Sequence, residues 1–181
     1  YRATLFLAPI VWDAIGEVVR SAHRAMEWLQ KVARVATKAD LPINWTTPDG
    51  FYVSQRYPNL RHREIRTTID GKIVKLRMSE EEETKLDSRR QAQGISPNFV
   101  HSLDACALRM YVSLALDNGV RHFALVHDSY GTVAADVQMM SACLRHAFVE
   151  IYRDGQTLER FRDEVCAPLE ERHLKEIPEI P

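Results

Sequence analysis

The sequence predicts an α+β fold in which long helices pack on short antiparallel hairpins. Apolar residues recur every three or four positions in several long stretches, a pattern typical of amphipathic helices. Three pairs of β-prone runs are each interrupted by turn residues, which indicates hairpins. The expected order is helix, hairpin, basic hairpin, helix, hairpin, helix and tail. Because strands and helices do not alternate singly, a parallel β–α–β sheet is not expected.

The composition is that of an ordinary globular chain of 181 residues with a formal net charge of −1. The net charge gives no indication of a nucleic-acid partner, so only the charge of individual segments is informative. The three cysteines, Cys106, Cys143 and Cys166, are widely spaced, which favours reduced thiols and argues against a structural zinc site. The apolar stretch from Leu5 to Trp12 is far too short to span a bilayer, so no membrane partner is expected.

The N-terminal unit, residues 1–40, is predicted to contain one long amphipathic helix over residues 11–37. At 1.5 Å per residue this helix would be about 40 Å long. Such a length suits a scaffold element of a large protein.

Two hairpins are predicted within residues 41–78. The first covers residues 43–55 around the turn Pro48-Asp49-Gly50. The second covers residues 62–78 around Asp70-Gly71, a candidate type I′ turn. Between residues 56 and 77 there are seven Arg or Lys residues and two acids, so this hairpin is basic. It is either a nucleic-acid-binding element or an edge hairpin kept soluble by charge.

The next unit, residues 95–153, is predicted as helix, hairpin and helix. After an acidic run at residues 80–83, expected as a loop or helix start, Ser96 and Pro97 give the N-cap and first-turn signals of a helix. Asn98, His101 and Ala105 share one face of that helix, which either approaches a ligand or is simply exposed. Asn118-Gly119 ends it.

The segment from Phe123 to Val133 is predicted to be a tight hairpin that turns near Gly131 and carries Asp128 at its tip. A bare carboxylate on a rigid turn is a suitable ligand for Mg²⁺. The alternative is that Asp128 only helps to form the turn. Asp136 is expected to cap a helix over residues 137–152, and the tail, residues 154–181, to hold one more helix.

A tip carboxylate near a helix with Asn and His, together with a basic hairpin, indicates phosphoryl transfer on nucleic acid. Two-metal nucleotidyl transfer needs carboxylates that hold two Mg²⁺ ions about 4 Å apart. A second carboxylate is therefore required beside Asp128. The candidates within the chain are Asp87, Asp104 and Asp136, and none has a compelling spacing.

Three ordered motifs resemble one known family. Residues 96–104 (SPNFVHSLD), residues 126–132 (VHDSYGT) and residues 45–51 (WTTPDGF) resemble segments in the C-terminal palm and fingers of single-subunit RNA polymerases, the phage and mitochondrial type. The resemblance covers nearly the whole chain.

The resemblance implies a role for each matching residue. Asp128 matches the second of the family's two catalytic, metal-binding aspartates, and His101 matches a histidine near the growing end of the RNA–template duplex. Asn98 and His127 belong to the same two motifs and are expected to contact nucleic acid. The basic hairpin matches the family's promoter specificity loop. Its basic residues are therefore candidates for DNA contacts: Arg61, Arg63, Arg66, Lys72, Lys75 and Arg77.

The resemblance further implies a template-directed nucleotidyltransferase in transcription, with Mg²⁺ as cofactor. Its partners would be the DNA template and promoter, nascent RNA, nucleoside triphosphates and the upstream remainder of the polymerase, in the cytoplasm of a bacterial host if a phage or prophage encodes it. The family's first catalytic aspartate and its fingers helix are absent from this chain. The isolated chain is therefore expected to be inactive.

Three alternatives remain open at this stage. A family A DNA polymerase fragment shares the palm architecture, but its hairpin typically reads His-Asp-Glu, whereas this one reads His-Asp-Ser. A non-catalytic nucleic-acid-binding module or degenerate prophage remnant would keep the basic hairpin without activity. An unrelated α+β interaction domain would use Asp128 only as a turn residue.

Overall fold

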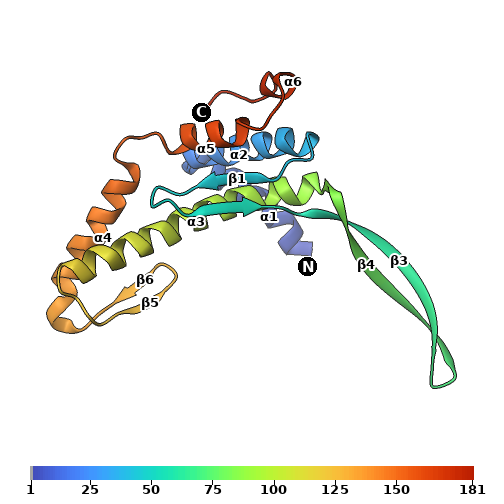
Figure 1. Ribbon diagram of the computed structural model, residues 1–181, viewed down its shortest axis with the longest axis horizontal. Coiled ribbons are helices and arrows are strands. Elements are labelled where there is room, and N and C mark those ends of the chain that lie inside the picture. Colours follow the sequence, from blue (N-terminus) through green and yellow to red (C-terminus); the bar gives the residue numbers. More distant parts are fainter. Residues whose placement is uncertain (1) are drawn as a thin grey trace.

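The structure is a computed structural model that describes residues 2–181, and it confirms the α+β fold. The long helix α3 forms the axis of the molecule, with the β3–β4 hairpin projecting from one end and the β5–β6 hairpin lying at the other (Figure 1). The helices are α1 (Arg2–Val18), α2 (Arg20–Lys38), α3 (Ser88–Asp117), α4 (Val137–Tyr152), α5 (Thr157–Cys166) and α6 (Glu171–Leu174). The strands pair as β1 (Ile43–Thr46) with β2 (Tyr52–Gln55), β3 (Pro58–Ile69) with β4 (Lys72–Leu86), and β5 (Ala124–Val126) with β6 (Ser129–Gly131), and a 3₁₀ turn (Ala134–Asp136) precedes α4.

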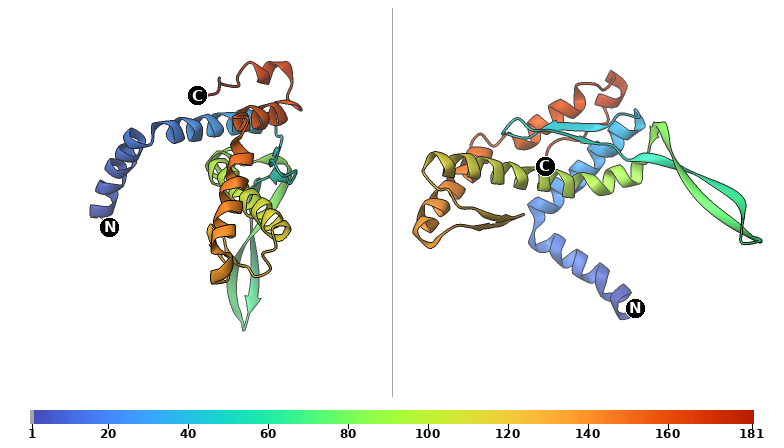
Figure 2. Two further views of the ribbon diagram at one scale, coloured as in Figure 1. Left: turned by 90° about the vertical axis from the view of Figure 1, so that its left-hand side faces the viewer. Right: turned by 60° about the horizontal axis from the view of Figure 1, so that its bottom comes forward.

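The predicted single helix over residues 11–37 is wrong, because the chain breaks at Val19 into α1 and α2. The two helices meet at an angle, and α1 points away from the rest of the molecule (Figure 2). The bend brings Gly16 so close to His23 that a Cβ there would lie 2.8 Å from the imidazole Nδ1. Apolar periodicity continues through both helices, so it carries no sign of the break.

The main core lies where α2, β1, α3 and α5 meet. Phe161 of α5 stands at its centre, with its ring centroid 4.9 Å from Phe99 of α3 and 5.8 Å from Trp45 of β1. Trp28 of α2 closes the cluster at 6.0 Å from Phe161. Edge-to-face aromatic packing of this kind holds the β1–β2 hairpin firmly on α3.

The β3–β4 hairpin, called the arm from here on, is longer than predicted. Asp70 and Gly71 both have positive φ, at 50° and 73°, which confirms the type I′ turn. The acidic run at residues 80–83 belongs to β4 and not to a loop or helix start. Pairing across the arm overrides the low strand propensity of glutamate, since Arg61 lies directly opposite Glu80.

Helix α3 begins eight residues before the predicted cap at Ser96. Asp87 is the true N-cap, and its carboxylate accepts a hydrogen bond from the backbone N–H of Arg90 at 3.0 Å. Pro97 therefore lies inside the helix. Pro97 and Gln93, four residues earlier, are both exposed, so water can satisfy the carbonyl that proline leaves without a donor. The predicted end at Asn118-Gly119 is confirmed, with φ of 89° at Gly119.

Helix α3 is also long and apolar enough, by length and composition alone, to cross a membrane. A third of its apolar window is buried in the fold. One side packs against α2 and β1 and another against α4.

A second cluster fixes the β5–β6 hairpin to the far end of α3. The ring of Tyr111 on α3 is buried and lies 5.2 Å from that of Tyr130 on β6 and 6.1 Å from that of Phe123. The hairpin turns at His127 and Asp128, and not near Gly131, which is the last residue of β6. Asp136 occupies the N-cap position of α4 as predicted, although its side chain makes no capping hydrogen bond.

Candidate nucleic-acid site

Asp128 stands at the tip of the β5–β6 hairpin, where the structure exposes it to solvent. Val126 pairs with Ser129, so the turn consists of His127 and Asp128 alone. His127 adopts φ of 51°, the left-handed conformation that a two-residue turn requires. Within residues 2–181, no hydrogen bond or ion pair engages the Asp128 carboxylate. Both of its oxygens are available to a ligand.

A groove of about 820 Å³ joins this tip to α3. His101 and Asp104 line it from the helix, while His127 and Asp128 line it from the hairpin. The predicted proximity of Asp128 and His101 is therefore found. We call this space the acidic groove. Of the three candidate second carboxylates only Asp104 lines it, since Asp87 and Asp136 occupy helix N-caps.

The chemistry of the groove fits Mg²⁺ only in part. Two carboxylates that face one open space are the hard oxygen ligands that the ion prefers. Across the described residues, however, no group of three His, Cys, Asp or Glu side chains is arranged to hold a metal. Asp128 and Asp104, which line the same groove, can supply part of a ligand set. Further carboxylates outside this chain would complete it.

Asn98, predicted to bind nucleic acid, is largely occupied by the fold. Its amide nitrogen donates to Oε1 of Gln55 at 2.8 Å and to the hydroxyl of Tyr57 at 3.0 Å. Gln55 in turn donates to the side chain of buried Gln91 at 2.8 Å. This network ties the start of the arm to α3, and only the Oδ1 atom of Asn98 is left for a ligand.

The turn of α3 that carries His101 is fixed by its neighbours. The Trp45 indole N–H donates to Oγ of Ser102 at 2.9 Å, and that hydroxyl donates to the carbonyl of Phe99 at 2.7 Å. His101 itself is exposed. A rigid helix turn thus presents an exposed imidazole toward the groove.

The arm has two different faces, because residues directly opposite each other in an antiparallel pair project to the same side. One face is polar: His62 donates to or accepts from Ser79 at 3.0 Å, and Lys75 lies 3.4 Å from Glu64. The other has an apolar middle. The six predicted basic residues divide equally, with Arg66, Lys75 and Arg77 on the polar face and Arg61, Arg63 and Lys72 on the apolar face.

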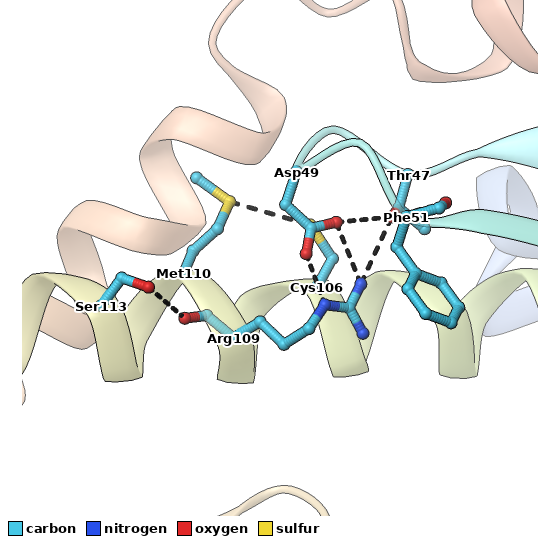
Figure 3. Close-up of polar contacts among 7 residues, drawn as sticks. All are labelled: Thr47, Asp49, Phe51, Cys106, Arg109, Met110 and Ser113. Atoms are coloured by element: carbon cyan, nitrogen blue, oxygen red, sulfur yellow. Dashed lines mark hydrogen bonds and ion pairs between the residues drawn. The ribbon is translucent and has the colours of Figure 1, made fainter.

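An ion pair that the sequence analysis missed fastens the β1–β2 turn to α3 (Figure 3). Arg109 donates through Nε to Oδ2 of Asp49 at 2.5 Å and through Nη2 to Oδ1 at 2.9 Å. The Thr47 hydroxyl donates to the same carboxylate at 2.5 Å. The guanidinium carbon also lies 4.6 Å from the ring centroid of Phe51. Asp49 and Arg109 are 60 positions apart, so a single sequence does not indicate that they form an ion pair.

The pair shifts the pKa of each group around it. Burial alone would raise the pKa of Asp49, but the hydrogen bonds from Arg109 and Thr47 outweigh it and hold the pKa of this carboxyl well below its usual range. Burial and the contact with Asp49 raise the pKa of the neighbouring Cys106 thiol to about 11. Cys106 is therefore an inert, protonated core residue at neutral pH.

The depressed pKa of Asp49 makes the β1–β2 hairpin sensitive to acid. We expect Asp49→Asn to lower the opening free energy of residues 43–55 by about 1–2 kcal/mol at pH 7, since a charged hydrogen-bonded pair is lost. A lowered folded pKa gives stability that is complete above the unfolded pKa and fades below it. The difference in opening free energy between the wild type and Asp49→Asn should therefore become smaller as the pH falls below about 4.

Amide hydrogen exchange of residues 43–55, corrected for the intrinsic rates at each pH, measures this difference. Asp117→Asn, at an exposed acid that ends α3, is the matched control and should leave the exchange unchanged. A difference that stays constant down to about pH 3 would contradict the role of the Asp49 carboxylate.

An exposed acid and an imidazole line one groove, on a scaffold that also carries a long arm whose outer part, residues 61–77, has six Arg or Lys residues and two acids. These features fit a protein that processes nucleic acid. The comparison with known families agrees and is more specific. The chain belongs to the DNA-dependent RNA polymerase family, whose family model matches residues 1–179.

Curated relatives include RNA polymerases of phages and of plant organelles. The chain is 34% identical to the DNA-directed RNA polymerase of Enterobacteria phage K11 over 194 residues, which cover 99% of this chain and 21% of the relative. It is 38% identical to that of Pseudomonas phage phiKMV over 152 residues, covering 84% and 18%. It is 36% identical to the mitochondrial DNA-directed RNA polymerase 1 of Nicotiana sylvestris over 192 residues, covering 100% and 18%.

The chain thus spans about a fifth of the length of the relatives it matches. The resemblance to phage and mitochondrial RNA polymerases is confirmed. The hypothesis of an unrelated α+β interaction domain is wrong, because family membership covers nearly the whole chain. These relatives are RNA polymerases, which disfavours the DNA polymerase alternative.

Proposed function

We propose that this chain is the C-terminal palm and fingers part of a DNA-directed RNA polymerase, and that it supplies one wall of the site where a nucleotide joins the growing RNA. The observation that carries the proposal is the acidic groove, in which Asp128 and His101 face one open space. Family membership supports the same reaction.

Each residue of the groove has a part in this function. Asp128 would hold Mg²⁺ together with a carboxylate from the remainder of the polymerase. When bound, the cation favours ionisation of the attacking hydroxyl and offsets charge on the leaving pyrophosphate. His101 would donate a hydrogen bond to the minor-groove edge of the newest base pair. Because Trp45 and Ser102 fix the helix turn, the imidazole is positioned before the duplex arrives.

The arm would contact promoter DNA. Figure 1 places it at the end of α3 opposite the β5–β6 hairpin. The groove residues His101 and Asp104 lie 13 and 16 positions after Ser88, the first residue of α3, which corresponds to about 20–25 Å of helix. Promoter binding and nucleotide addition would therefore take place at separate parts of the chain.

Extension of RNA by the full polypeptide that contains this chain tests the proposal. A preassembled RNA–DNA scaffold with Mg²⁺ and nucleoside triphosphates should be extended according to the template, at an ionic strength similar to that of bacterial cytoplasm. The isolated chain is expected not to extend it, since further carboxylates are needed. A full polypeptide that binds the scaffold without extending it would favour the degenerate, non-catalytic alternative and reject the proposal.

A further inference from the structure

A second cavity lies beside the acidic groove, between α3 and the β1–β2 hairpin. Its volume is about 380 Å³, and Phe51, Ser54, Asn98 and Arg109 line it. We call it the hairpin pocket. His101 and Ala105 line both spaces. Because the side chain of Ala105 is a single methyl group, α3 presents a low ridge between them at this position, one turn beyond His101. A strand in the acidic groove can therefore continue into the hairpin pocket.

Arg109 enters this pocket with part of its guanidinium unused. Asp49 accepts from Nε and Nη2, and Thr47 lies 3.3 Å from Nη2. The third nitrogen, Nη1, has no acceptor within the part of the chain that the structure describes, and Figure 3 shows it on the side away from the carboxylate. Two N–H groups are thus available to a ligand.

The position of Nη1 is fixed in advance. The carboxylate fork and the Phe51 ring, at 4.6 Å, hold the guanidinium from two directions. A planar, oriented guanidinium loses little conformational entropy when it binds an oxyanion, and phosphate is the oxyanion that arginine recognises best. Asp49 occupies only Nε and Nη2, so its ion pair with Arg109 leaves Nη1 free for the ligand.

We propose that Arg109 binds a backbone phosphate of the nucleic-acid strand that passes from the acidic groove over Ala105 into the hairpin pocket. The inference rests on the proposed function and extends it from the groove to a second space. Arg109 then holds the strand in register. Asp49 and Phe51 act as positioning residues that orient Nη1 of Arg109 toward the phosphate.

Binding of an RNA–DNA scaffold to the full polypeptide, measured between 50 and 200 mM salt, tests the contact. Arg109→Ala should weaken binding about tenfold at 100 mM salt and reduce the slope of log affinity against log salt by about 0.7–0.9, the value for one phosphate. Arg109→Lys keeps the charge, so it should weaken binding but preserve the slope. A merely structural role of Arg109 would not change the slope.

The matched control is Arg162→Ala. Arg162 of α5 is also paired with a neighbouring aspartate, Asp163, at 2.7 Å, and it lines neither cavity. This variant removes the same charge and should leave both affinity and slope unchanged.

Scaffolds that carry one neutral methylphosphonate linkage at a time identify the phosphate. One position should weaken binding by the wild type, weaken binding by Arg109→Lys to a smaller extent, and have no effect on Arg109→Ala. If the wild type binds and no linkage behaves in this way, the Arg109 contact is overturned and the proposed function stands. If the wild type does not bind any scaffold, the proposed function fails together with it.

Discussion

Asp128→Asn in the full polypeptide should reduce nucleotide addition about a thousandfold, which corresponds to about 4 kcal/mol of transition-state stabilisation. The amide has nearly the same shape as the carboxylate, but it carries no charge and presents an N–H₂ group toward the cation. Asp128 is exposed, and its side chain makes no hydrogen bond or ion pair with the described part of the chain, so folding should not change. The loss would therefore be a loss of chemistry alone.

Single-nucleotide extension of a preassembled scaffold at saturating nucleoside triphosphate measures this effect. Asp117→Asn, the same change at the exposed end of α3, should extend at the wild-type rate. Asp104→Asn, at the other acid of the groove, should cost about tenfold, because it changes the electrostatic surroundings of the metal. A rate for Asp128→Asn within about twofold of wild type would remove Asp128 from the reaction.

The hairpins were predictable because their turns carry local chemistry. Asp70-Gly71 requires two residues with positive φ, and the structure shows both. Pro48-Asp49-Gly50 likewise marks the β1–β2 turn, where Gly50 has φ of 85°. The position of Asp128 at a hairpin tip was predicted for the same reason, although the turn lies at His127-Asp128 and not near Gly131, where it was expected.

The helix boundaries were less predictable because their causes are tertiary. The break at Val19 brings Gly16 close to His23, a tertiary arrangement that apolar periodicity does not indicate. Helix α3 starts at Ser88 because the arm ends at Leu86 and Asp87 caps the helix. The Ser96-Pro97 pair has the signals of a helix start but lies inside a continuous helix. Neither feature can be separated from its alternatives by periodicity alone.

The candidate site divides in the same way. Asp128 and His101 were found from their motifs, and the groove brings them together. Arg109 was missed, because its partner Asp49 lies 60 positions earlier in the chain. The two faces of the arm, in contrast, follow from alternation once the Asp70-Gly71 turn fixes the register, so the sequence alone contained that information.

Arg66, Lys75 and Arg77 should together carry most of the promoter affinity of the arm. They share its polar face, while the opposite face has Ile65, Leu76 and other apolar side chains in its middle. A two-stranded ribbon that enters the major groove presents one face to the bases and phosphates. Replacing the three polar-face residues by alanine should lower promoter-dependent initiation about a hundredfold or more at physiological salt, since three basic contacts are lost.

The chain offers a control of equal charge. Replacing Arg61, Arg63 and Lys72 by alanine removes the same three charges from the other face, where Arg61 already lies opposite Glu80. This second triple variant should lower initiation by about tenfold or less, because only long-range attraction is lost. Both variants should extend a preassembled scaffold at the wild-type rate, since the arm precedes the first residue of α3 and the acidic groove is lined from the middle of that helix. Equal losses for the two triple variants would mean that the arm attracts DNA by charge alone and does not present a particular face to it.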